Sequence, residues 1–229
     1  MIKTLILTPI YINIVYMLDK NILKTNTPYL QTGLLLEIFR DYSSPRDKLK
    51  NLVKKNNLIN VVQGLYVPGP DYNKAYSKEV LAGIIFGPSA LTFEYALSYH
   101  GLIPERVERI TSLCFKRDKL FNTPLGCFSY KYIAQKKFSI GLEYVQTSLG
   151  NFIIASPEKA ILDMAYFEAI QGEDDAYIYL TKNLRIEEKS LRELDHQKLE
   201  DIQEVYSKKS TFYVLRVIKE LIRQNGENK

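Results

Sequence analysis

The side chains best placed to do chemistry lie between residues 43 and 67, in SSPRDKLKNLVKKNNLINVVQGLYV. Lys and Arg neutralise the phosphates of nucleic acids, and Asn or Gln side chains can read the edges of bases. The segment carries both kinds, so it predicts contact with DNA. The DNA-binding residues that we expect are Ser44, Arg46, Lys48, Lys50, Asn51, Lys54, Lys55 and Gln63. A lysine-rich helix that only faces solvent beside a hairpin remains the alternative.

A helix from Pro45 to about Asn56 would position these side chains. Ser44 is a favoured N-cap, and proline suits the first helical position. Asn56 or Asn57 can end the helix in the left-handed conformation. At helical spacing Leu49, Leu52 and Val53 form one narrow apolar stripe, which leaves the basic residues on the other faces.

Two further elements flank this helix. An earlier helix is expected with Thr27 as its N-cap and Pro28 at its first position, because apolar residues recur after it at helical spacing. The stretch LINVVQGLYV predicts a hairpin that turns at Gln63-Gly64. Helix, basic helix and small hairpin follow one another in the order of a winged helix-turn-helix, in which the hairpin braces the recognition helix.

A second group of candidate residues lies in SPEKAILD and SYHGL. Lys159 and Asp163 are four residues apart, so they can form an ion pair on one helix face worth a few tenths of a kcal/mol. Glu158 suits a helix N-terminus. His100 ends an apolar helix and is expected to be a structural, hydrogen-bonded histidine. No second acidic motif joins these residues, so we expect no catalytic site.

Other reactive motifs are missing from the sequence. It contains no GxSxG, no phosphate-binding loop ending in GK[ST] and no HExxH. Cys114 and Cys127 do not form a CxxC, and histidine occurs only twice, so a zinc site is not expected. Both cysteines are interpreted as small buried hydrophobes. We therefore expect no metal, no cofactor and no enzymatic activity.

The remaining chain alternates helical and strand patterns. Helices are expected from Ser77, from Pro88 to Gly101, and from Pro157 with Ser156 as N-cap. ERITSLCFKR and PLGCFSYKYI predict strands joined through Asn122 and Pro124, with Cys114 and Cys127 facing each other across the hairpin. IGLEYVQTS and GNFIIAS predict a second hairpin, and two helices follow in HQKLEDIQEVYSKK and STFYVLRVIKELIRQ. The residues expected to be largely buried are Leu97, Leu102, Ile161 and Leu162.

The predicted fold class is α+β. An N-terminal winged helix-turn-helix would be followed by a mixed α/β domain with a largely antiparallel sheet and a helical C-terminal tail. The expected divisions are an extension at 1–26, a DNA-binding domain at 27–72 and a C-terminal domain at 73–229, joined at YVPGPDYNK.

Composition agrees with a globular chain. The 229 residues are 46% hydrophobic and 25% charged, with a formal net charge of +5. The N-terminal run MIKTLILTPIYINIVYML faintly resembles a signal peptide, but Pro9 and Asn13 interrupt it, so an extra strand or helix is preferred. Met17 as the true start is a further alternative. No segment reads as transmembrane, and a soluble cytoplasmic protein without membrane partners is expected.

Four segments in order resemble the AbiEi family of type IV antitoxins. They are the basic helix with its hairpin, GPSALTFEYALSYHGLIPERVERITSL, TPLGCFSYKYI and IASPEKAILD. The resemblance implies an N-terminal winged helix that represses its own operon by binding inverted repeats in double-stranded promoter DNA. It also implies a C-terminal domain that counters a nucleotidyltransferase-like toxin, with or without stable contact. The matching segments assign this role to Tyr99, His100, Lys159 and Asp163.

One departure from the family pattern affects the wing. Val61, Val62 and Gln63 stand where the family often has Lys or Arg before the glycine. Two alternatives stay open beside the antitoxin hypothesis. One is a transcriptional regulator whose C-terminal domain dimerises or senses a ligand, and the other is a nucleic-acid-processing enzyme targeted by a winged helix.

Overall fold

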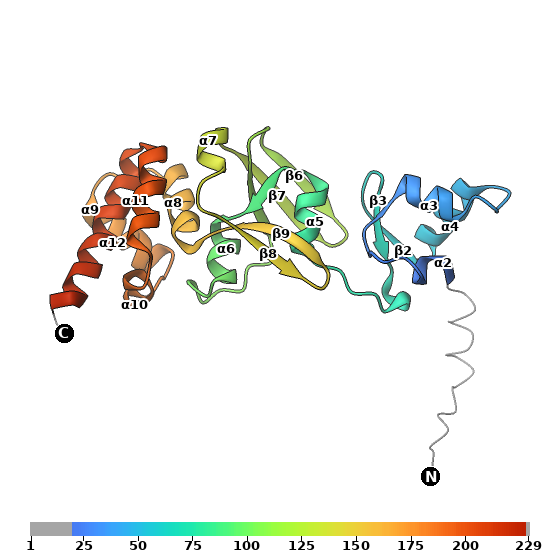
Figure 1. Ribbon diagram of the computed structural model, residues 1–229, viewed down its shortest axis with the longest axis horizontal. Helices are drawn as coiled ribbons and strands as arrows, with labels where there is room; N and C mark the ends of the chain where they lie inside the picture. Colours follow the sequence, from blue (N-terminus) through green and yellow to red (C-terminus); the bar gives the residue numbers. More distant parts are fainter. Residues whose placement is uncertain (1–19, 228–229) are drawn as a thin grey trace, which may run out of the picture. The chain divides into compact units, whose positions relative to one another are not determined.

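The computed structural model describes residues 20–227, with side chains to residue 224 (Figure 1). This part divides into two compact units. The first comprises residues 20–77 with Thr123–Leu125, and the second comprises Lys78–Asn122 with residues 126–227. The division thus falls after Ser77, whereas the sequence suggested one between residues 72 and 73. The strand or helix expected in MIKTLILTPIYINIVYML lies outside the described residues.

The first unit combines short helices with a three-stranded sheet. Its helices are α2 (Lys20–Leu23), α3 (Thr32–Ile38), α4 (Pro45–Lys54) and the single turn η1 (Pro70–Tyr72). Its strands are β1 (Leu30–Gln31), β2 (Leu58–Val62) and β3 (Leu65–Pro68), in the order β1-β3-β2 with both pairs antiparallel. The basic helix and the hairpin expected from the sequence are therefore both present.

The helix expected from Thr27 begins later. Leu30 and Gln31 pair with Tyr66 and Leu65 of β3, so this stretch is extended and α3 starts at Thr32. The Thr27 hydroxyl accepts the Tyr29 backbone N–H at 3.2 Å, which stabilises a local turn instead of a helix cap. The short strand β1, which pairs with β3, thereby stands where the first turn of the expected helix would be.

The apolar stripe of α4 packs into the core of this unit. Leu49 and Leu52 are buried against side chains from α2, α3 and β2, and Val53 packs on the same cluster. The other buried members of this core are Ile22, Leu30, Leu35, Phe39, Leu58 and Tyr72. One face of α4 is thus fixed, and the opposite face is left to solvent.

The end of α4 is joined tightly to the exit of β3. Asn56 takes the left-handed conformation expected of it, with φ 57°. The Gly69 N–H then donates to the Asn57 carbonyl at 2.8 Å. The two backbones approach so closely that a Cβ on Gly69 would lie 1.8 Å from the Asn56 carbonyl oxygen. Helix and hairpin are therefore held together by backbone contacts.

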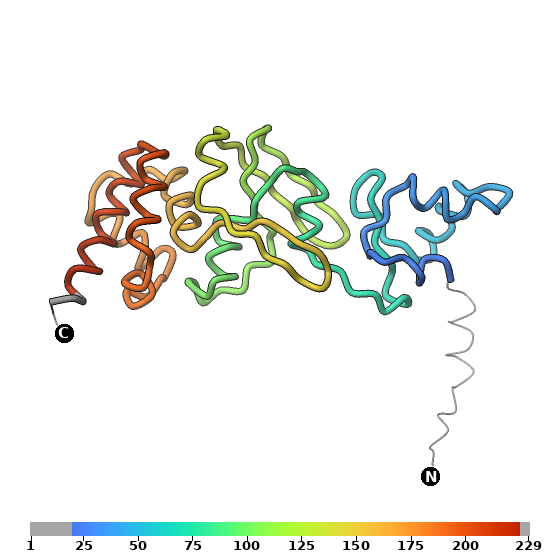
Figure 2. The backbone as a smooth tube through the Cα atoms, viewed as in Figure 1, coloured from blue at the N-terminus to red at the C-terminus, as the bar shows by residue number. Residues whose placement is uncertain are grey.

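The second unit contains a six-stranded sheet in the order β6-β7-β5-β4-β9-β8. The strands are β4 (Ser89–Leu91), β5 (Ile110–Cys114), β6 (Lys119–Thr123), β7 (Gly126–Tyr132), β8 (Leu142–Thr147) and β9 (Gly150–Ala155). The pairs β4–β5 and β8–β9 are antiparallel, whereas β4–β9 and β5–β7 are parallel. Figure 2 shows β8 and β9 side by side in yellow. The predicted α+β class with a largely antiparallel sheet is confirmed.

Helices complete the second unit. They are α5 (Lys78–Ile85), α6 (Phe93–Tyr99), α7 (Gln135–Phe138), α8 (Pro157–Phe167), α9 (Glu173–Ile178), the π-helical turn η2 (Tyr179–Asn183), α10 (Glu188–Arg192), α11 (His196–Tyr206) and α12 (Lys209–Glu227). Within this unit α8 lies between the sheet and the C-terminal helices, and it contacts α6 and β9 as well as α11 and α12 (Figure 1). The helical C-terminal tail is as expected.

Two sequence-based expectations for this unit are wrong. The segment from Pro88 to Gly101 is not one helix, because Ser89–Leu91 form the buried strand β4 between β5 and β9. The β5 and β7 strands are parallel neighbours with β6 between them in sequence, so they form no hairpin. Cys114 is opposite Tyr132 in this register instead of Cys127, and both cysteines are free thiols.

The burial expectations are mostly correct. Leu97, Ile161 and Leu162 are fully buried. Leu102 is only partly buried, and its neighbour Ile103 enters the core instead. In residues 20–227, no helix combines the length and apolar character that a bilayer crossing requires.

The close approach at Gly69 gives a first prediction. Gly69→Ala should lower the free energy of unfolding of the first unit, because its methyl group meets backbone rather than a flexible side chain. The expected loss is at least 1–3 kcal/mol. Urea denaturation followed by circular dichroism measures it.

Gly33→Ala is the matched control. A Cβ at Gly33 meets nothing within 4 Å, and the residue lies inside α3. Alanine there should stabilise the helix by about 0.5–1 kcal/mol. Equal effects of the two substitutions would contradict the argument.

Candidate nucleic-acid interface and the buried Lys159 cluster

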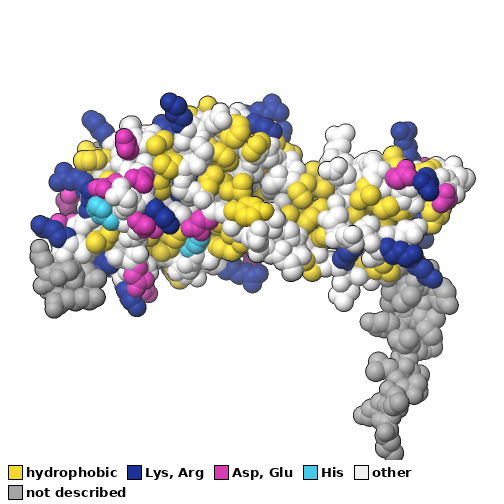
Figure 3. Space-filling view, in the orientation of Figure 1, with side chains coloured by type: hydrophobic (Ala, Val, Ile, Leu, Met, Phe, Trp, Pro, Cys, Tyr) yellow, Lys and Arg dark blue, Asp and Glu magenta, His cyan; other side chains and the backbone are white. Residues whose placement is uncertain are grey.

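The outer face of α4 carries most of the residues expected to contact DNA. Those that are exposed are Arg46, Lys50, Asn51, Lys54 and Lys55. Ser44 and Lys48 are half-buried, and Gln63 is exposed in the turn between β2 and β3. Figure 3 shows Lys and Arg side chains (dark blue) standing out from the part of the molecule that the first unit forms. Seven of the predicted residues thus lie on α4 and its two caps. Gln63 lies apart from them, in the β2–β3 turn, where the Gly64 carbonyl accepts the Thr32 N–H at the start of α3.

The first turn of α4 contains one opposing charge. The Ser44 hydroxyl donates to Asp47 Oδ2 at 2.6 Å, and Lys50 Nζ lies 3.7 Å from Asp47 Oδ1. The Ser44 hydrogen bond, with the Lys50 ammonium, holds the pKa of Asp47 below its usual value. Ser44 occupies the N-cap position as expected, but its hydroxyl bonds this carboxylate instead of a backbone N–H. Asp47 is therefore anionic at neutral pH and offsets part of the basic charge.

Lys48 is held differently from the other lysines of α4. Its ammonium lies 4.5 Å from the centre of the Tyr42 ring, a cation–π contact just before the helix. Lys54 and Lys55, nearly two turns further on, are exposed at the helix end. The basic groups of α4 most open to a phosphate backbone are therefore Arg46, Lys50, Lys54 and Lys55.

In the second unit, His100 joins α6 to the end of β9. Its Nε2 lies 2.8 Å from the Ala155 carbonyl oxygen, a hydrogen bond that the sequence led us to expect. Tyr99 is 48% exposed, and its ring packs edge-on against His100 and Phe152. Of the four residues assigned to toxin neutralisation, Tyr99 presents the most accessible surface.

Lys159 and Asp163 form an ion pair inside the protein. Lys159 Nζ lies 2.9 Å from Asp163 Oδ1, and both side chains are completely buried. The predicted pairing is confirmed, but the small energy expected for an exposed helical pair does not apply here. A charge that is removed from water must be compensated by its partners. Loss of either partner is therefore expected to lower the stability of the second unit.

Every donor of this lysine has an acceptor. Besides Asp163, its ammonium donates to Tyr206 Oη at 2.6 Å and to the Lys137 carbonyl at 3.0 Å. The Tyr206 hydroxyl donates to Asp163 Oδ1, and the Thr92 hydroxyl donates to Asp163 Oδ2 at 2.5 Å. We call Thr92, Lys159, Asp163 and Tyr206 the Lys159 cluster. It connects α8 with α11, with α7 and with the start of α6.

The sequence analysis did not identify Tyr206 or Thr92. They lie 43 and 71 residues away from Asp163, and no local spacing links them to it. Burial, with the adjacent Asp163 carboxylate, raises the pKa of Tyr206 far above its usual value. The phenol therefore stays protonated and keeps donating to Asp163.

Three neighbouring features add to the close packing around the cluster. Gly141 has φ 67°, and a Cβ there would lie 2.8 Å from Ile202 and 3.0 Å from the Lys159 side chain. Ser156 caps α8 as expected, since its Oγ accepts the Lys159 N–H at 3.3 Å. Glu158 Oε1 accepts the Asp195 backbone N–H at 3.0 Å, so this carboxylate also serves the packing of α8.

The structure therefore places the candidate residues in three different environments. The DNA-binding set lies on an exposed helix, Tyr99 and His100 lie at the end of α6, and Lys159 and Asp163 are enclosed. Within the described part of the chain, no three His, Cys, Asp or Glu side chains are grouped so that they could hold a metal ion. Comparison of the sequence with models of protein families and with curated proteins finds no significant match.

The Lys159 cluster gives a second prediction. Lys159→Met keeps most of the side-chain volume but leaves the Asp163 carboxylate buried without its counter-charge. The free energy of unfolding should fall by about 3–5 kcal/mol. Urea denaturation at neutral pH measures the loss.

Two further variants test the cause of that loss. Arg223→Met breaks an exposed ion pair with Glu220 and should cost less than about 1 kcal/mol. Lys159→Met/Asp163→Asn removes both buried charges and should recover part of the stability. A loss for Lys159→Met as small as that for Arg223→Met would overturn the assignment.

Proposed function

We propose that this protein is a DNA-binding repressor whose first unit is a winged helix-turn-helix with α4 as the recognition helix. In this proposal α4 enters the major groove, where Asn51 reaches base edges and Arg46, Lys50, Lys54 and Lys55 contact phosphates. Ser44, Lys48 and Gln63 would make the flanking contacts. The target is double-stranded promoter DNA with inverted repeats, which the AbiEi resemblance implies.

One observation carries the proposal. The inner face of α4 is packed against a complete small core, while its outer face presents basic and amide side chains together. The close approach of Gly69 to Asn56 joins this helix to the hairpin through the backbone. A helix held in this way can enter a groove without losing its own packing, which favours a recognition element over a solvated surface helix.

The proposed wing is uncharged, since residues 58–68 contain no Lys, Arg, Asp or Glu. The hairpin turn bears Gln63 beside Gly64, and Val61 is buried. Its contribution to DNA binding would therefore come from bracing α4 and from uncharged contacts with the backbone.

We further propose that the second unit provides the antitoxin activity against a nucleotidyltransferase-like toxin. Of the residues assigned to this role, Lys159 and Asp163 have no surface to offer a partner, so they would act by holding the fold. Tyr99 is the exposed member, and His100 would fix its position at the end of α6. Direct contact with the toxin, if it occurs at these residues, would involve Tyr99.

A third prediction tests DNA binding. Lys50→Ala/Lys54→Ala should weaken binding to every DNA sequence and flatten the dependence of log K on log salt, by roughly 0.9 for each lost phosphate contact. Fluorescence anisotropy with a promoter duplex at several salt concentrations measures the slope. Asn51→Ala should instead change the ranking of DNA sequences.

The control keeps the same change in net charge. Lys182→Ala/Lys189→Ala removes two exposed lysines from the second unit and should leave the salt slope unchanged. If the slope is the same in both double variants, α4 is not the DNA-contacting helix.

A fourth prediction separates the two activities in the full chain. Lys50→Ala/Lys54→Ala should lose promoter repression and still protect cells from the toxin. Leu97→Ala removes a fully buried side chain of the second unit and should cost about 2–5 kcal/mol, with a loss of protection. A reporter assay and growth rescue, done on the same strains, measure both. Protection lost with the α4 lysines would place the antitoxin activity outside the second unit.

A further inference from the structure

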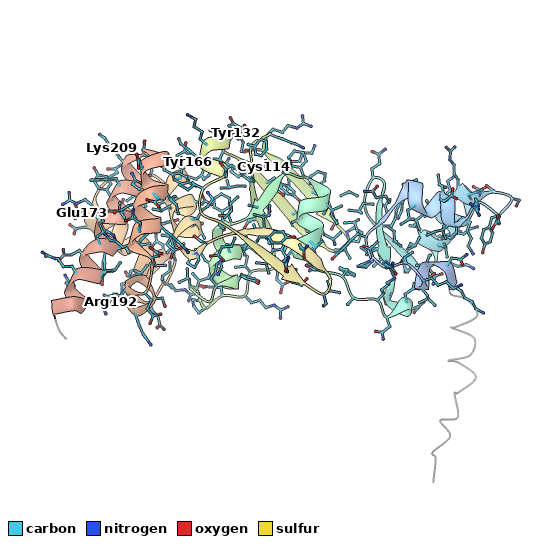
Figure 4. The ribbon with its side chains drawn as sticks, in the orientation of Figure 1. Cys114, Tyr132, Tyr166, Glu173, Arg192 and Lys209 are labelled. Carbon is cyan, nitrogen blue, oxygen red and sulfur yellow. The ribbon has the colours of Figure 1, made fainter. Side chains whose placement is uncertain are left out.

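Two pairs of adjacent lysines meet on the second unit, although they lie far apart in the sequence. Lys136 and Lys137 lie in α7, and Lys208 and Lys209 lie at the junction of α11 and α12. The Tyr166 ring joins the two pairs, because Lys137 Nζ lies 4.7 Å and Lys208 Nζ 5.1 Å from its centre. In Figure 4, Tyr166 and Lys209 both lie along the upper margin of the second unit. We call these four lysines the four-lysine surface.

No carboxylate balances the charge of this surface. Through residues 20–224, no Asp or Glu oxygen lies within ion-pair distance of the four ammonium groups. Glu168 is the acidic residue nearest in sequence to Tyr166, but burial and the Glu168 carboxylate together raise the pKa of Tyr179, so this carboxylate acts on η2. Lys131, whose ammonium lies over the Phe167 ring, is paired with Asp118 and is not counted here. Because like charges gathered in one place repel one another, a bound anion would stabilise the four-lysine surface.

The inner two lysines are held in place by the packing around the Lys159 cluster. The Lys137 carbonyl accepts from Lys159 Nζ at 3.0 Å, and Lys137 Nζ donates to Tyr166 Oη at 3.1 Å. Lys208 Nζ donates to the Tyr166 backbone carbonyl. The Tyr166 ring packs in turn against the Tyr206 ring, with 5.3 Å between the ring centres. Part of the positive charge is therefore fixed before any ligand arrives.

The outer two lysines are open to a ligand. Lys136 and Lys209 are exposed, and among the described side chains their ammonium groups make no hydrogen bond, ion pair or cation–π contact. Phe167 lies beside them, with its ring centre 5.1 Å from that of Tyr166, and is 38% exposed. An exposed ring next to several ammonium groups offers a nucleic acid both a contact for a base and contacts for phosphates.

We propose that the four-lysine surface binds single-stranded RNA. The phosphates would contact Lys136 and Lys209, the inner lysines would add positive charge, and a base would lie against Phe167. A duplex keeps its bases stacked inside the helix, whereas the unpaired bases of RNA are open to aromatic side chains. The exposed ring therefore favours single-stranded RNA over duplex DNA, and over acidic proteins, which carry no bases. This inference goes beyond the proposed contact between α4 and DNA and does not depend on it.

Fluorescence anisotropy on the full chain tests the proposal. The probe is a labelled RNA of about 12 uridines, within the range of roughly 4–16 nucleotides that single-strand sites cover. We expect this RNA to bind, and the same RNA without label to displace it. A duplex DNA with the same number of phosphates, or polyglutamate, should displace it at least about tenfold less effectively, since neither presents an open base.

Substitutions assign the binding to this surface. Lys136→Ala/Lys209→Ala should weaken RNA binding at least about tenfold and lower the salt slope by roughly 0.7 for each lost phosphate contact. Lys182→Ala/Lys189→Ala makes the same change in net charge at exposed positions of the second unit and should bind RNA as the parent does. Phe167→Leu should weaken binding at least about fivefold and leave the salt slope unchanged, because it removes a stacking contact and no charge.

The variant Lys50→Ala/Lys54→Ala separates this surface from α4. It should keep the RNA affinity of the parent, whereas Lys136→Ala/Lys209→Ala should keep the affinity for promoter DNA. If α4 does not bind DNA, the RNA measurements are unaffected, so the two proposals fail separately. The RNA proposal is overturned if the RNA does not bind, if duplex DNA displaces it as well as unlabelled RNA does, or if Phe167→Leu has no effect. It is also overturned if Lys136→Ala/Lys209→Ala binds RNA as its control does, or if the α4 variant loses RNA binding.

Discussion

The ion pair between Lys159 and Asp163 is the constraint on which the second unit depends. Both groups are fully removed from water, so each is stable there only with its complete set of partners. Those partners come from α7, α11 and the residue before α6, and they must all be in place together. The sheet side and the helical side of α8 are therefore coupled through a single lysine. An apolar replacement of both residues could be about as stable, because the cost of removing two charges from water offsets much of their attraction.

In the first unit, fewer groups hold the key element, helix α4, in place. The unit must hold a short helix of ten residues in one orientation while leaving most of that helix uncovered. Two leucines on the inner face and a backbone contact at Gly69 accomplish this. Because the constraint lies in the backbone and the core, the outer side chains of α4 can change without loss of the fold.

Local signals predicted the elements whose ends are set by local chemistry. Ser156 with Pro157 identified the start of α8, Asn56 identified the end of α4, and Gly64 identified the hairpin turn. The errors occur where a distant strand decides the conformation. Leu30 and Gln31 are extended because β3 pairs with them, and Ser89–Leu91 form a strand because β5 and β9 lie on either side. The spacing of Lys159 and Asp163 predicted their pairing. Their burial depends on Thr92 and Tyr206, which no nearby residue indicates.

The long sequence separations within the Lys159 cluster also determine which unit can fold first while the chain is being synthesised. Apart from Thr123–Leu125, the first unit is complete once Ser77 has left the ribosome. Asp163 must wait for Tyr206, and the central strand β4 remains without one neighbour until β9 has been made. At ordinary translation rates this delay is on the order of ten seconds. During that time a nascent chain can carry a finished N-terminal unit while the sheet of the second unit still exposes an unpaired strand. Such a strand is a site for binding by chaperones, so synthesis of this protein is expected to be more sensitive to slow elongation after residue 91 than before residue 77.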